Sequence, residues 1–179
     1  DGKPQYLNNC DWVGAARLSC NIFSTERIGD EVYSASNIVA VDAAGGNVRA
    51  LSQSRGENAR GYDFRGGEIL DFLPSEDGAV LMARSYVPEG KIGSLIERRA
   101  EGLGVDRVDT RSGAVRRVET PNKNAYRYIS DGHGNVRVMG LWERKDSGYF
   151  TGRYKFMYRG PTDSGWSFLS SYDAPRSEE

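Results

Sequence analysis

An internal repeat constrains the fold of this chain more than any other feature of its sequence. The stretch Asn37–Leu51 aligns without a gap to Gly104–Val118, which lies 67 positions further on. Both stretches place apolar and β-branched residues on either side of a glycine-containing turn, a pattern typical of a β-hairpin. A repeat of this length indicates an array of equivalent structural units. The identical pairs are Val41 and Val108, Asp42 and Asp109, Gly46 and Gly113, Val48 and Val115, and Arg49 and Arg116.

Each hairpin belongs to a longer unit of four short strands, and three such units span about residues 10–51, 69–118 and 125–172. The first strands contain an aromatic residue each, namely Trp12, Phe72 and Tyr128. Polar or glycine-rich connections are expected at 24–35, 52–67 and 86–102. Because glycine supplies positive φ angles, hairpin turns are predicted near Gly45-Gly46, Asp77-Gly78, Gly113 and Gly132.

The sequence therefore predicts an all-β fold, a partial β-propeller of about three four-stranded antiparallel blades. The alternative is an ordinary β-sandwich whose self-similarity is accidental. Since three blades do not close a ring, we expect the isolated chain to leave at least one blade face or strand edge uncovered.

Charge and hydropathy exclude some partners. Basic and acidic residues number 24 and 25, and this balance argues against a nucleic acid or an anionic membrane as the partner. No apolar run reaches the roughly 18 residues of a membrane span, so no membrane-spanning segment is expected. The N-terminus, Asp1–Gln5, has no basic-then-apolar signal, and the compartment is not read from it.

Two cysteines, Cys10 and Cys20, flank the first predicted turn. If Gly14-Ala15-Ala16 is a three-residue loop, Val13 pairs with Arg17 and Trp12 with Leu18, and the cysteines lie opposite each other. Directly opposed strand residues are somewhat further apart than a relaxed disulfide requires. A disulfide and two small buried thiols therefore both remain open. Two ligands alone do not make a zinc site.

The order of an aromatic-led strand, a turn such as Pro74–Gly78 and a Val-Asp…Gly…Val-Arg hairpin resembles the N-terminal propeller of prolyl oligopeptidase and dipeptidyl-peptidase-type serine peptidases. Trp12–Leu51 and Ile69–Val118 carry the likeness. Propellers of that family have about seven or eight blades, so the likeness covers three of them. TolB-like and secreted sugar-binding propellers share such motifs.

The resemblance implies a non-catalytic propeller segment that gates and helps to select peptide substrates for a separate, downstream α/β-hydrolase domain. The parent protein would then be a serine peptidase, with a periplasmic or secreted location favoured over a cytoplasmic one. No cofactor is expected. The alternative is a TolB-like or stand-alone propeller module that binds a protein or glycan partner.

No catalytic, cofactor-binding or metal-ligating residue is assigned. The family's nucleophile lies in Gly-x-Ser-x-Gly, whereas Gly165-Trp166-Ser167-Phe168 has its serine in the wrong place. Glu178-Glu179 lies in a polar tail and does not match the glutamate pair with which some dipeptidyl peptidases hold a substrate amino terminus. Gly56–Gly67 lacks the Gly-Lys-Ser/Thr end and the following helix of a phosphate-binding loop.

The remaining candidates have ordinary structural explanations. His133, the single histidine, is expected to be a solvated turn residue, since a triad needs a nucleophile and an orienting group in contact with it. Asp42 and Asp109 precede equivalent turns, which favours turn capping over acid–base or cation chemistry. The arginine pairs Arg98-Arg99 and Arg116-Arg117 are expected to bind Glu97, Asp106 and Asp109 rather than a peptide carboxylate.

Overall fold

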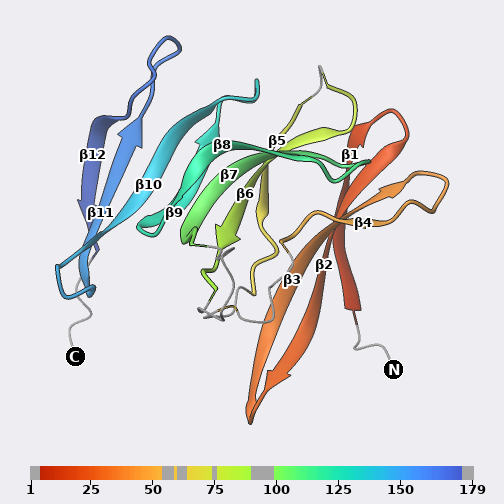
Figure 1. The fold of residues 1–179 in the computed structure, drawn as a ribbon, viewed down its shortest axis with the longest axis horizontal. Coiled ribbons are helices and arrows are strands. Elements are labelled where there is room, and N and C mark those ends of the chain that lie inside the picture. The colour runs from red at the N-terminus through yellow and green to blue at the C-terminus, as the bar shows by residue number, and fades with distance from the viewer. Residues whose placement is uncertain (1–4, 54–58, 60–63, 74–75, 90–98, 175–179) are drawn as a thin grey trace.

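The structure, a computed structural model, is all-β and forms three four-stranded antiparallel sheets (Figure 1). It describes residues 5–53, 59, 64–73, 76–89 and 99–174. Strands that follow one another along the chain are also neighbours within each sheet. This meander is the architecture of a propeller blade, and the prediction of a partial propeller with about three blades is confirmed.

The blades follow one another in chain order, and Figure 1 shows them from right to left. Blade 1 contains β1 (Gln5–Gly14), β2 (Arg17–Ile28), β3 (Glu31–Asp42) and β4 (Arg49–Ala50). Blade 2 contains β5 (Glu68–Phe72), β6 (Ala79–Tyr86), β7 (Gly102–Asp109) and β8 (Val115–Asn122). Blade 3 contains β9 (Ala125–Ser130), β10 (Val136–Arg144), β11 (Phe150–Tyr158) and β12 (Ser167–Asp173).

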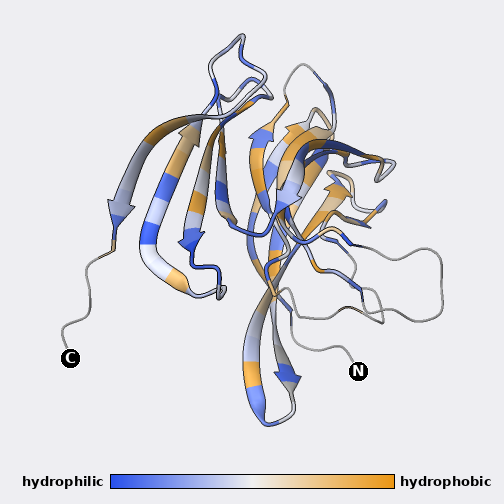
Figure 2. Cartoon of the chain, turned by 60° about the vertical axis from the view of Figure 1, so that its left-hand side comes forward, coloured by the Kyte–Doolittle hydropathy of each residue, from blue (hydrophilic) through white to orange (hydrophobic). Residues whose placement is uncertain are grey.

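The hydrophobic core lies between the blades, and β6 is its central strand. Val80 and Met82 pack against blade 1, whereas Ala79 and Leu81 pack against blade 3. Such a continuous apolar run is typical of a strand that is buried on both faces. Figure 2 shows apolar positions along strands of all three blades. The middle blade therefore joins two separate cores.

Polar contacts also join neighbouring blades. The backbone N–H of Gly78 in blade 2 donates to the carbonyl oxygen of Val13 in blade 1 at 3.0 Å. Between blades 2 and 3, the Tyr128 hydroxyl donates to the carbonyl oxygen of Leu103 at 3.4 Å. Burial raises the pKa of Tyr128 to about 12, so this phenol remains a neutral donor at physiological pH.

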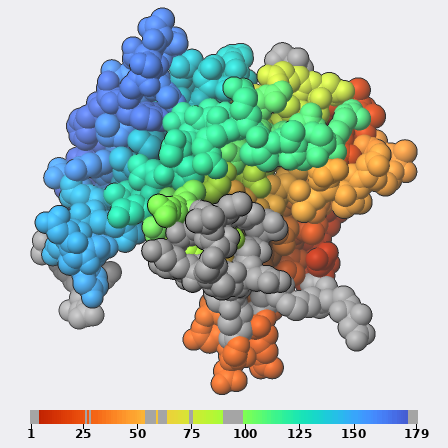
Figure 3. All heavy atoms as spheres, viewed as in Figure 1, coloured from red at the N-terminus to blue at the C-terminus, as the bar shows by residue number. Residues whose placement is uncertain are grey.

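The polar segment 24–35 is not a connection, and that prediction is wrong. The structure places it in the outer half of a long hairpin, in which Ser24 pairs with Ala35 and Ile28 with Glu31. The hairpin turns at Gly29, whose φ of 62° suits glycine, and it protrudes from blade 1 (Figure 3). The predicted linker 52–67 and the connection 86–102 lie partly outside the described residues.

The predicted hairpin turns are confirmed by positive φ angles at Gly45, Gly46, Gly78, Gly113 and Gly132. The first turn differs by one residue from its prediction. Trp12 pairs with Leu18 and Cys10 with Cys20 as expected, but Gly14 rather than Val13 pairs with Arg17. The irregularity at Val13 shortens the loop to Ala15-Ala16. Of the two states left open for the cysteines, the structure has the disulfide.

Candidate functional site

A groove between blades 1 and 2 is the best candidate for a binding site. Its volume is about 220 Å³. Strands β1, β2 and β3 supply one wall, and β5 with the residue before it supplies the other. The lining residues are Asn9, Asp11, Ser19, Asn21, Ile38, Gly67, Glu68, Ile69 and Phe72.

Gly67 allows the second wall to form so close to the core. Its φ is 101°, and a Cβ atom there would lie 2.5 Å from the Met82 methyl carbon and 2.7 Å from the Ala83 carbonyl oxygen. A side chain at this position would therefore push β5 away from β6 and change the width of the groove.

Both walls of the groove combine a carboxylate with apolar surface, because Asp11 and Ile38 lie on blade 1 whereas Glu68, Ile69 and Phe72 lie on blade 2. Asp11 accepts a hydrogen bond from the Asn9 side-chain amide at 2.8 Å. In the part of the chain that the structure describes, neither Asp11 nor Glu68 forms an ion pair, and no basic residue lines the groove. Ile38, Ile69 and Phe72 supply apolar surface beside these carboxylates. This arrangement suits a cation carried on an aliphatic stem.

A second cluster centres on Asp106, which is fully buried in β7. Its carboxylate accepts from Arg84 Nη1 at 3.3 Å and from Arg117 Nε at 3.4 Å, and the Tyr86 hydroxyl also donates to it. The pKa of Tyr86 is raised, chiefly by burial and to a smaller extent by this hydrogen bond to Asp106. The expected pairing of Arg117 with Asp106 is confirmed, whereas Arg84 and Tyr86 were not predicted to take part.

The two equivalent aspartates differ in what they bind. Asp109 caps its turn as predicted, because Oδ1 accepts from the backbone N–H of Ser112 at 2.7 Å and of Arg111 at 2.9 Å. The bond from Ser112 is the largest influence that lowers the pKa of Asp109. The carboxylate of Asp42 instead accepts from the side chains of Asn47 and Arg17, and these bonds lower its pKa.

Arg17 is the reason for this difference. Its guanidinium is buried between blades 1 and 2 and contacts Asp42 in its own blade. It also donates to the hydroxyl and the carbonyl oxygen of Thr110, which follows β7 in blade 2. Asp42 is thus part of an interface between blades, which the repeat alone did not predict.

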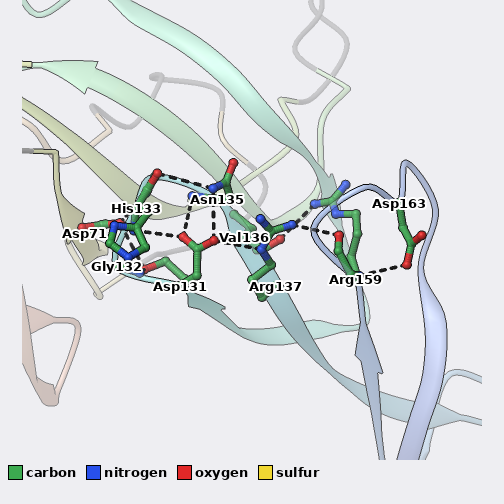
Figure 4. A network of polar contacts seen from close by, with 12 residues as sticks. Asp71, Asp131, Gly132, His133, Asn135, Val136, Arg137, Arg159 and Asp163 are labelled. Atoms are coloured by element: carbon green, nitrogen blue, oxygen red, sulfur yellow. Dashed lines mark hydrogen bonds and ion pairs between the residues drawn. The ribbon is translucent and has the colours of Figure 1, made fainter. Parts of the chain in front are cut away.

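His133 is an exposed turn residue, as predicted (Figure 4). The carboxylate of Asp131 accepts from the backbone N–H of His133 at 2.9 Å, from the Asn135 amide at 3.0 Å and from Arg137 Nε at 2.9 Å. Burial opposes ionisation of Asp131, but these bonds outweigh it and lower its pKa. Asp131, rather than His133, organises this turn.

The structure does not bring the other candidates together as a reactive site. Arg98, Glu97 and Glu178-Glu179 lie outside the described residues, as does most of Gly56–Gly67. Ser167 begins β12, so it does not occupy a strand-to-helix elbow. Among the described side chains, no three His, Cys, Asp or Glu residues gather as metal ligands. No helix in the described part of the chain is long and apolar enough to cross a membrane.

Comparison of the chain with protein-family models, with curated proteins and with solved structures gives no match.

Proposed function

We propose that this chain is a non-catalytic propeller segment that holds a peptide in the groove between blades 1 and 2. In doing so it helps to gate and select peptide substrates for a separate α/β-hydrolase domain of a serine peptidase. The groove is the observation that carries the binding function, because it joins apolar surface to two carboxylates that form no ion pair with any described residue. The peptidase context rests on the resemblance of the blades.

The chemistry of the groove favours one class of ligand. A lysine side chain has a charged ammonium at the end of an apolar stem, so it can contact the carboxylates and the apolar surface of the groove at once. The ammonium would lie beside Asp11 and Glu68, and the stem would lie along Ile38 and Ile69. A peptide with a basic residue is therefore the ligand we expect to bind most tightly.

Glu68→Gln and Asp11→Asn are each expected to weaken binding of an N-acetylated, C-amidated Ala-Lys-Ala peptide about fivefold, close to 1 kcal/mol for a solvent-accessible ion pair. Isothermal titration calorimetry measures the change. Asp146→Asn, which removes an exposed carboxylate from the β10–β11 turn, is the matched control. Equal binding of the peptide in which norleucine replaces lysine would contradict the assigned role of the carboxylates.

The chain alone is expected to hydrolyse no chromogenic prolyl or dipeptidyl substrate. Acyl transfer needs an activated nucleophile and donors for the developing oxyanion. His133 lies in an exposed turn, and both cysteines are joined in the disulfide. The assay compares turnover with and without a serine-directed covalent inhibitor. Inhibitor-sensitive turnover by the pure chain would overturn the non-catalytic assignment.

A stand-alone, TolB-like module that docks a protein is the second candidate. The protruding β2–β3 hairpin favours it, because this hairpin extends beyond the body of blade 1 and exposes Val32 to 60%. Val32→Ser would weaken such docking without changing peptide binding in the groove. The two functions can thus be distinguished, because docking would depend on Val32 in the hairpin whereas peptide binding would depend on Asp11 and Glu68 in the groove.

A further inference from the structure

The outer edge of β5 contributes main-chain groups to the groove between blades 1 and 2. In the described part of the chain β5 pairs with β6 and with no other strand, so one of its edges is free. Glu68, Ile69 and Phe72 of this strand line the groove. A free strand edge presents unpaired N–H and C=O groups to an extended chain beside it. The groove therefore offers a backbone wall in addition to its side chains.

The ladder between β5 and β6 determines which main-chain groups point toward the free edge. In an antiparallel ladder, residue pairs that exchange hydrogen bonds alternate with pairs that do not. The carbonyl oxygen of Ala79 accepts from the backbone N–H of Leu73 at 3.3 Å, so Ala79 turns its main chain toward β5 and Met82, three residues further along β6, turns its main chain away. Ile69 lies opposite Met82. The N–H and C=O groups of Ile69 are therefore not used by β6 and point toward the free edge.

A bulge limits how much of this edge a further strand can use. It interrupts the ladder between Ile69 and Asp71 and so separates Ile69 from Phe72, the next residue that turns its main chain outward. The carbonyl oxygen of Leu70 already accepts from the Ser130 hydroxyl at 3.0 Å. By contrast, no described residue forms a hydrogen bond to the main chain of Ile69. Ile69 is thus the position at which a ligand backbone can pair.

We infer that a peptide binds in the groove as an additional antiparallel strand on β5, with its lysine opposite Ile69. The lysine N–H donates to the carbonyl oxygen of Ile69, and the lysine carbonyl oxygen accepts from the Ile69 N–H. One ligand residue carries both bonds only in antiparallel pairing, which is also the pairing of β5 with β6. In this mode of recognition the main chain supplies affinity and the side chain supplies specificity.

Charge complementarity fits the same register. Residues directly opposite each other across a ladder have neighbouring side chains on one face of the sheet. The Ile69 side chain packs against the core between blades 1 and 2, so the lysine side chain also points toward blade 1. Asp11 and Ile38 of blade 1 line the groove there, and Glu68, next to Ile69 in β5, adds the second carboxylate. Strand pairing and ionic attraction therefore act on one residue of the ligand.

This inference rests on the proposed function and deepens it, because it specifies how the peptide in that groove is held. The residues on either side of the lysine turn their N–H groups away from β5, since bonded and non-bonded positions alternate. The lysine N–H is therefore the one ligand donor that the pairing needs. The groove selects an extended peptide with an internal lysine rather than a simple alkylamine of the same charge.

Isothermal titration calorimetry with N-methylated peptides tests the inference on the full chain. N-methylation of the lysine in N-acetylated, C-amidated Ala-Lys-Ala is expected to weaken binding about tenfold, because it removes the bonded N–H and leaves the Ile69 carbonyl oxygen without its partner. N-methylation of the C-terminal alanine is the matched control and should change the affinity less than about twofold, because that N–H turns away from β5. An ester in place of the Ala-Lys amide removes the same donor without added bulk and should also weaken binding.

Amide hydrogen exchange, measured by NMR, gives a second readout. Saturating peptide should slow exchange of the Ile69 N–H, whereas the Glu68 N–H, which lies opposite Ala83 in the ladder with β6, is the internal control. Equal binding of the three modified peptides would overturn the inference. So would a loss of affinity confined to the control methylation, or an unchanged exchange rate at Ile69.

The same methylation series on the norleucine peptide distinguishes failure of this inference from failure of the proposed function. If the norleucine peptide binds as tightly as the lysine peptide and its own N-methylation at norleucine weakens it, the role of the carboxylates is wrong and strand addition holds. If the lysine peptide binds more tightly but N-methylation at lysine has no effect, the carboxylates act as proposed and strand addition is wrong. Absence of binding by either peptide overturns both.

Discussion

Replacing Asp106 with alanine is expected to lower the free energy of unfolding by about 3 to 5 kcal/mol, the range found when one partner of a buried ion pair is removed. Asp106 is fully buried, and Arg84 beside it has a side chain only 10% exposed. Without the carboxylate, the Arg84 guanidinium would remain buried with no counter-charge from β7. Arg84 Nε has no hydrogen-bond partner among the described residues, so no other described group is in place to compensate the Arg84 guanidinium when Asp106 is removed.

Urea denaturation of Asp106→Ala and of Asp106→Leu/Arg84→Met measures this loss, with all samples at one protein concentration because association would shift the midpoint. The double variant removes both charges and fills the space with apolar atoms, so it should be clearly more stable than Asp106→Ala. Arg116→Met removes an exposed charge from the paired strand β8 and is the matched control. A loss below about 1 kcal/mol for Asp106→Ala, the range of an exposed pair, would show that this cluster is well solvated.

The order of the strands could be predicted because local patterns determine it. The strands of the three blades span residues 5–50, 68–122 and 125–173, close to the predicted units of about 10–51, 69–118 and 125–172. The outer half of the β2–β3 hairpin was missed because its sequence is mostly polar, and apolar periodicity is the usual signal for a strand. The dipeptide Gly29-Asp30 at its tip was an available signal, since Gly-Asp is typical of a two-residue hairpin turn.

The candidate site was less predictable because it forms between units. Asp11 and Glu68 line one groove although 56 residues of chain separate them. Nothing in the local sequence around either residue indicates the other. The first-strand aromatics show the same limit, since Tyr128 is buried against blade 2 whereas Trp12 is largely exposed. Equivalent positions in a repeat acquire different surroundings at the ends of an incomplete array.

Replacing Arg17 with methionine is expected to lower the free energy of unfolding by about 3 kcal/mol, because it removes charge-assisted hydrogen bonds from a buried interface. Arg17 is 1% exposed and donates to both the hydroxyl and the carbonyl oxygen of Thr110. The Thr110 hydroxyl in turn donates to the carbonyl oxygen of Gly78 at 2.7 Å, so the contact holds the ends of β6 and β7 against blade 1. Asp42 is partly exposed, so after the substitution water can replace the hydrogen bond that its carboxylate now accepts from Arg17.

Urea denaturation is again the measurement, and Arg27→Met, which removes an exposed arginine from the protruding hairpin, is the matched control. Thr110→Val removes the hydroxyl that accepts from Arg17, and so tests the same contact from the side of blade 2. If Arg17 and Thr110 act as a unit, the double variant will lose less than the sum of the single losses. Strictly additive losses, or an effect of Arg17→Met no larger than that of Arg27→Met, would show that apolar packing between Val13, Val80 and their neighbours holds blades 1 and 2 together without this contact.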